Sequence, residues 1–102
     1  MGKLVRDLIP EIIRATGRAP AVRVLDAQGY ENALHDKLLE EAAELRQATT
    51  HDERLTEAAD VLEVLRALSI FSGFTLDDVI RAAEQKRIER GGFTDRLWLE
   101  HS

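Results

Sequence analysis

The stretches KLLEEAAELRQA (residues 37–48) and LTEAADVLEVLRALSI (residues 55–70) decide the fold of this chain. Both lack glycine and proline, and both repeat apolar residues at a spacing of three or four. Each is therefore predicted to form most of a long α-helix. The polar stretch TTHDERL, at the junction of the two, is expected to be a turn. Strand patterns are sparse elsewhere, so the sequence predicts an all-α fold.

Capping residues place the ends of the two long helices. Asp26 is expected to cap the first, which should run to about Ala48. Asp52 is expected to cap the second, which should end near Ser72, before Gly73. The resulting helices span about twenty residues each, long enough to form the body of a bundle.

Two shorter helices are expected on either side of this pair. Asp7 is a candidate N-cap for a helix over residues 8–16. Thr75 and Asp78 form a capping-box pattern for a helix that runs to about residue 90, where Gly91 and Gly92 stop it.

The second long helix is apolar around almost its whole circumference. A helix of this kind must be covered on all sides, and a chain of 102 residues can hardly supply that cover. We therefore expect a second subunit to complete the bundle, in a homodimer or homotetramer. The tail offers Phe93, Leu97 and Trp98 for docking on the body of the chain or on a partner.

The composition is that of a globular protein on the charged side, with 44% hydrophobic and 32% charged residues. A net charge of −5 argues against non-specific binding of nucleic acid or anionic membranes. The absence of cysteine excludes disulfides and thiolate metal sites. With no secretory signal and no membrane-length apolar run, a single cytoplasmic domain over residues 1–102 is expected.

Five carboxylates occupy the two long helices: Glu40, Glu41 and Glu44 in an E-E-x-x-E pattern, and Glu57 and Asp60 in E-x-x-D. Residues three or four apart share a helix face, so each group can converge on one point. Glu41 falls within the apolar stripe of its helix, Glu44 lies on the flank of that stripe, and Glu40 lies further round. Two interpretations stay open, namely structural salt bridges or a shared cation.

A cation is favoured because Glu57 and Asp60 interrupt an apolar helix, where an unpaired carboxylate is costly. All candidate ligands are hard oxygens, which suit Mg²⁺ or Mn²⁺. A di-iron site would need E-x-x-H pairs, and the sequence contains none. A carboxylate not engaged as a ligand can accept a proton from water, and Glu40 is the better candidate for that role.

Basic residues gather near both ends of the chain: Lys3 and Arg6 at the start, and Lys86, Arg87 and Arg90 before the Gly-Gly pair. The second group either complements a helix dipole or clamps phosphate. Arg6 and Arg90 are the stronger phosphate candidates because a guanidinium binds phosphate through two hydrogen bonds.

Four segments in this order resemble a known family: KLVRDLIPEII (3–13), KLLEEAAE (37–44), EAADVLEV (57–64) and RGGF (90–93). The chain looks like the all-α nucleoside triphosphate pyrophosphohydrolases, which include MazG, the dimeric dUTPases and phosphoribosyl-ATP pyrophosphohydrolase. It is most similar to their small house-cleaning group. The resemblance implies a MazG-like helical bundle with long antiparallel helices, completed by a second subunit.

The resemblance also implies an activity. Such enzymes cleave between the α and β phosphates of a nucleoside triphosphate, giving a nucleoside monophosphate and pyrophosphate. Mg²⁺ would be held by Glu41, Glu44, Glu57 and Asp60, with Glu40 or Glu41 activating water. The expected substrate-binding residues are Lys3, Arg6, Asp7, Lys37, Lys86 and Arg90. Two alternatives stay open: a nucleotide-binding or regulatory module without catalysis, and a structural helical domain with salt-bridged acids.

Overall fold

The computed structural model describes residues 2–102, so Met1 of the expected domain lies outside the described part. Four helices follow one another: α1 (Ile9–Ala15), α2 (Ala27–Gln47), α3 (His51–Phe71) and α4 (Leu76–Arg90). Between residues 2 and 102 there is no strand. The predicted all-α class is therefore confirmed.

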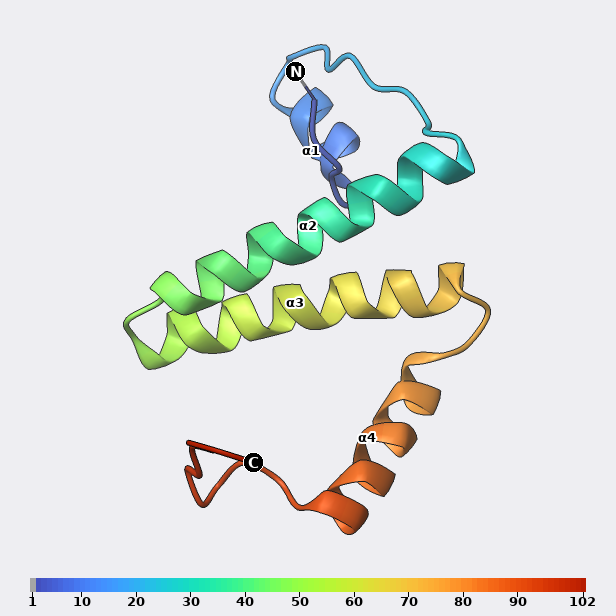
Figure 1. Ribbon diagram of the computed structural model, residues 1–102. Coiled ribbons are helices and arrows are strands. Elements are labelled where there is room, and N and C mark those ends of the chain that lie inside the picture. Colours follow the sequence, from blue (N-terminus) through green and yellow to red (C-terminus); the bar gives the residue numbers. More distant parts are fainter. Residues whose placement is uncertain (1) are drawn as a thin grey trace.

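The central unit is an antiparallel hairpin of α2 and α3 (Figure 1). Asp26 caps α2 as expected, because its Oδ1 accepts a hydrogen bond from the Gly29 N–H at 2.8 Å. The cap of α3 is Thr50, so the expected cap at Asp52 is wrong. Thr50 and Glu53 bond each other's backbone N–H groups in a reciprocal capping box, and this places Asp52 in the first turn.

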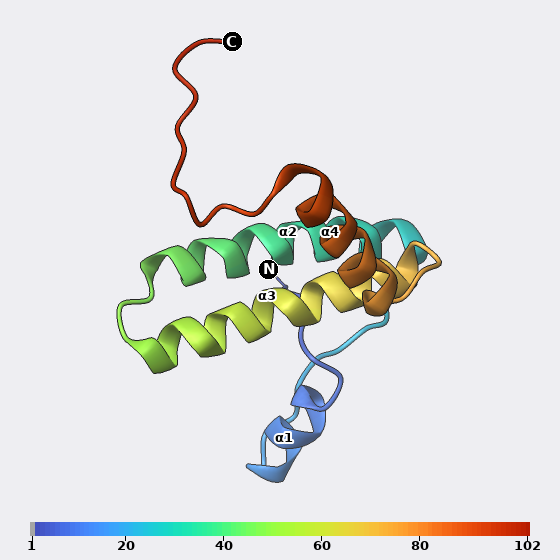
Figure 2. The ribbon, with the colours of Figure 1, turned by 90° about the horizontal axis from the view of Figure 1, so that it is seen from below.

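The two shorter helices lie on opposite sides of the hairpin (Figures 1 and 2). α1 begins after Leu8 with no side-chain cap, so the expected cap at Asp7 is wrong. Proline in the first turn supplies the helical φ angle that starts α1 instead. The predicted capping box of α4 is confirmed, because Thr75 and Asp78 exchange hydrogen bonds of 2.9 and 3.1 Å.

The buried core of one chain is thin. Only Leu34, Val64 and Leu76 are buried apolar residues in the described part. A folded monomer of 11.5 kDa exposes about 5,800 Å², whereas this chain exposes 9119 Å². Its radius of gyration is 17.5 Å, against about 13 Å for a compact chain of this length. Much apolar surface is therefore uncovered.

The uncovered surface includes parts of α3 and the whole C-terminal tail. Leu62 and Ile70 on α3 are exposed, as the all-round apolar pattern of that helix anticipates for a single chain. In the tail, Phe93 is 99% exposed and Trp98 is 84% exposed, so neither docks on the body of its own chain. No helix within residues 2–102 is long and apolar enough to cross a membrane.

Candidate metal and nucleotide site

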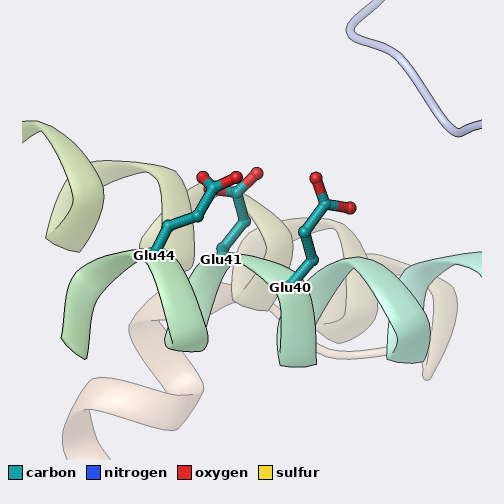
Figure 3. A group of neighbouring side chains, drawn as sticks. All are labelled: Glu40, Glu41 and Glu44. Carbon is teal, nitrogen blue, oxygen red and sulfur yellow. The ribbon is translucent and has the colours of Figure 1, made fainter. Parts of the chain in front are cut away.

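Packing of α2 against α3 joins the two acidic groups of the sequence. Oxygens of Glu41 on α2 and of Glu57 and Asp60 on α3 lie within 4.8 Å of one another. A second set, Glu40, Glu41 and Glu44, meets the same limit along α2 alone. Figure 3 shows these three side chains pointing to the same side of α2, with the Glu41 and Glu44 carboxylates close together. Glu41 belongs to both sets and is the centre of the site.

Glu41 is also the buried member of the cluster, with only 7% of the residue exposed. Its Oε2 is buried and has no hydrogen-bond partner, and the same is true of Oε2 of Glu57. Burial raises the pKa of the Glu41 carboxyl above its ordinary range, and the neighbouring Glu44 raises it further. Lys37 acts in the opposite direction on this pKa. The fold therefore holds a carboxylate in a place that disfavours its charge.

Two basic side chains offset part of this negative charge. Nζ of Lys37 lies 3.5 Å from Oε1 of Glu40 and 3.4 Å from Oε1 of Glu41. Nη2 of Arg6 donates to Oδ1 of Asp60 at 2.8 Å. Neither basic residue reaches the buried oxygens of Glu41 and Glu57 within hydrogen-bonding distance. The compensation is therefore incomplete.

A cleft of about 790 Å³ opens beside the acids, between the N-terminal segment and the hairpin. Its polar wall carries predicted site residues from three parts of the chain: Lys3, Arg6, Asp7, Lys37, Glu41 and Asp60. Its apolar wall includes Ile12, Tyr30, Leu34 and Val64. The Tyr30 ring packs edge-on against Phe71, with a centroid separation of 5.7 Å. The cleft therefore combines charged and apolar walls, as small-molecule sites commonly do.

The donor set suits a hard divalent cation. The candidate ligand atoms are all carboxylate oxygens from two packed helices, and two of the three residues, Glu41 and Glu57, each have a buried oxygen without a partner. A buried unpaired carboxylate oxygen is costly, and a cation at this point would satisfy it. Glu41, Glu57 and Asp60 are the residues best placed to hold such an ion, with Glu44 adjoining them through Glu41.

The remaining predicted residues lie elsewhere in the chain. Lys86 and Arg90 are exposed on α4, outside the residues that line the cleft. Glu63, which the sequence interpretation did not select, does line it. Its position three residues after Asp60 could have indicated this, because residues three apart share a helix face. The cleft of one chain thus contains the N-terminal basic residues but not those of α4.

Comparison with known proteins matches most of the chain to one family. A model of the phosphoribosyl-ATP pyrophosphohydrolase family matches residues 5–87. A protein of Mycolicibacterium smegmatis described as uncharacterized is 56% identical over 55 residues. That alignment covers 54% of this chain and 56% of the relative, so the chain matches little more than half of the relative's length. No solved structure matches.

Proposed function

Because the chain belongs to the phosphoribosyl-ATP pyrophosphohydrolase family, within the MazG-like all-α nucleoside triphosphate pyrophosphohydrolases, we propose that it is a Mg²⁺-dependent nucleotide hydrolase. The substrate would be a nucleoside triphosphate or a close relative, and the role would be the removal of unwanted nucleotides from the cytoplasmic pool. One observation carries the proposal: Glu41, Glu57 and Asp60 converge, with two unpaired buried oxygens, beside a cleft that has basic residues.

Mg²⁺ is the cation that these oxygen ligands favour, and Mn²⁺ is the expected substitute. Glu41, Glu44, Glu57 and Asp60 are the proposed ligands. A divalent cation bound by them would neutralise phosphate oxygens and lower the pKa of the attacking water. The raised pKa of Glu41 supports this assignment, because a nearby cation would favour the charged form that burial disfavours.

The proposed proton acceptor is Glu40. Its side chain is 49% exposed, so a water molecule can reach it, and Lys37 lies 3.5 Å from its Oε1. In the proposed reaction the water oxygen forms a bond to the α-phosphorus and the bridging bond from α-phosphorus to the β-phosphate oxygen breaks. The proton of the water passes to the Glu40 carboxylate, and pyrophosphate leaves.

Basic side chains on the cleft wall suit the polyphosphate. Arg6 and Lys3 come from the N-terminal segment and Lys37 comes from α2. A guanidinium binds two phosphate oxygens at once, whereas an ammonium acts as a point charge. We propose that the base or sugar packs on the apolar part of the cleft, where Tyr30 and Leu34 form the wall.

We propose further that the active form is a homodimer or homotetramer. The exposed area of 9119 Å² supports this, because it exceeds that of a compact monomer by about 3,300 Å², at least as much as one partner buries in a large obligate interface. A second subunit would also explain why Lys86 and Arg90 do not line the cleft of their own chain. α4 lies across the hairpin from the N-terminal helix of its own chain (Figure 1), so these two residues would serve the cleft of a partner.

The decisive experiment is a nucleotide panel assayed for monophosphate and pyrophosphate with Mg²⁺. The panel should include standard and modified ribo- and deoxynucleoside triphosphates, and phosphoribosyl-ATP. Glu57→Gln and Asp60→Asn should remove pyrophosphate release while the helical signal in circular dichroism is kept. Asp52→Asn is the matched control, because it neutralises a 99% exposed acid on α3 itself, outside both acidic groups.

The two classes of outcome separate hydrolysis from binding. Pyrophosphate release that persists in both site variants would contradict the assignment of the acids. Nucleotide binding without pyrophosphate release across the panel would favour the alternative of a nucleotide-binding or regulatory module. A chain with no thermal stabilisation by Mg²⁺ and nucleotide together would be a structural helical domain.

A further inference from the structure

Arg6 occupies a singular position in the hydrogen-bond network. Within residues 2–102, its bond to Asp60 is the one side-chain hydrogen bond between positions more than four residues apart. It connects the N-terminal segment to α3 across 54 positions of sequence. Its acceptor is one of the three carboxylates proposed to hold a cation. The N-terminal segment is therefore attached to the hairpin at the cation site itself.

Arg6 and a divalent cation would compete for the carboxylate of Asp60. The Glu41, Glu57 and Asp60 oxygens lie within 4.8 Å of one another, so an ion among them would lie close to the guanidinium. Like charges at such a distance in a partly buried site repel strongly, and the carboxylate cannot fully neutralise both.

The solvent exposure of the two basic side chains indicates which of them a cation would displace. The Arg6 side chain is 59% exposed, whereas that of Lys37 is 24% exposed. Arg6 can turn into solvent or into the cleft, which it also lines. Lys37 is confined by its own helix beside Glu40 and Glu41. Arg6 is therefore the residue that a cation would move.

We propose that Arg6 is an internal counter-ion of Asp60 that a divalent cation displaces, so that cation loading frees the guanidinium to bind phosphate in the adjoining cleft. The inference rests on the cation site proposed above. It makes cation binding and phosphate binding cooperative, because the first ligand removes the contact that withholds Arg6 from the second.

The first test measures Mn²⁺ binding to the whole chain without nucleotide, from the electron paramagnetic resonance signal of free Mn²⁺. Arg6→Gln should tighten binding roughly two- to fivefold, which is the worth of an exposed ion pair. Arg66→Gln is the matched control. It removes the same charge six residues from Asp60 on α3, where Arg66 pairs with Glu63 at 3.5 Å. It should change the Kd for Mn²⁺ less than Arg6→Gln does.

Three results of this test would overturn the inference. Unchanged Mn²⁺ binding in Arg6→Gln would mean that there is no competition. Weaker binding would mean that Arg6 orients Asp60 as a ligand. Equal tightening in Arg66→Gln would mean that only overall charge matters.

The second test uses inorganic pyrophosphate as the probe, measured by calorimetry with and without Mn²⁺. Arg6→Gln should weaken pyrophosphate binding about tenfold with Mn²⁺ and by a much smaller factor without it. Equal weakening in both conditions would overturn the release step. If the wild-type chain binds Mn²⁺ through Asp60 but hydrolyses no nucleotide, the proposed function fails and the counter-ion inference stands.

Discussion

Replacing Glu41 by Gln should stabilise the fold while removing the activity. Glu41 is 7% exposed, and its Oε2 has no hydrogen-bond partner. Glutamine has the same shape without the charge, and its amide can donate to a neighbouring carboxylate. A buried unsatisfied polar group costs about 1–3 kcal/mol. The lost ion pair with Lys37 offsets up to about 1 kcal/mol of that gain, because Lys37 keeps its pair with Glu40 and is not left as an unpaired buried charge.

The expected net stabilisation is therefore about 1 kcal/mol, which corresponds to a rise in Tm of about 4–8 °C for a chain of this size. The assay is thermal unfolding followed by circular dichroism in EDTA near pH 7, at one fixed protein concentration. Glu40→Gln is the matched control, since Glu40 shares Lys37 but is exposed. Its free energy of unfolding should stay within about 0.5 kcal/mol of that of the wild type.

The pH dependence of the stability difference between Glu41→Gln and the wild type gives an independent check on its sign. Burial raises the pKa of Glu41 in the folded chain, so folding favours its neutral form. The cost of its charge is absent where the carboxyl is protonated in both states, it sets in as pH rises above the unfolded pKa, and it is complete above the raised folded pKa. The advantage of Gln should therefore shrink towards about pH 4 and be largest near neutrality.

Saturating Mg²⁺ should reverse the order of the Tm values, so that the wild type becomes more stable than Glu41→Gln. The wild type gains about 2.7 kcal/mol at a hundredfold excess of cation over its Kd, and Glu41→Gln loses a central ligand. A lower Tm of Glu41→Gln in EDTA near neutral pH would refute the reasoning. It would mean that the Lys37 pair outweighs the desolvation of Glu41.

Three further outcomes are expected. Asp60→Asn and Arg90→Gln should each be inactive on their own. If the two variants are mixed and refolded as dimers, about half of the dimers contain one subunit of each kind, and one of the two sites in such a dimer is intact, so about a quarter of wild-type pyrophosphate release should return. No recovery would place Arg90 in the cleft of its own chain. Leu62→Asp, on the exposed part of α3, should shift the sedimentation coefficient towards that of a monomer, and an unchanged value would remove Leu62 from the interface. Thr75→Ala should lower Tm through the loss of its hydrogen bond with the Asp78 N–H, at a cost of about 1 kcal/mol, and a Tm equal to wild type would show that this cap is dispensable.

The helices of this chain were largely predictable because their signals are local. Asp26 and the Thr75–Asp78 box cap helices as the sequence predicts. The errors were local as well: Thr50 rather than Asp52 caps α3, because Glu53 returns its hydrogen bond. The sequence already carried this signal, because Thr50 and Glu53 have the same capping-box spacing as Thr75 and Asp78, whereas the residue three positions after Asp52 is Leu55.

The sequence by itself determined that five acids lie on two helices and that Glu41 falls in an apolar stripe, because helical periodicity assigns each residue to a face. Only the tertiary structure decided that Glu41 meets Glu57 and Asp60. That meeting depends on the rotation and register of α2 against α3, which arise from side-chain packing between elements distant in sequence. The same packing brings Arg6 to Asp60 and leaves α4 across the hairpin from the N-terminal helix.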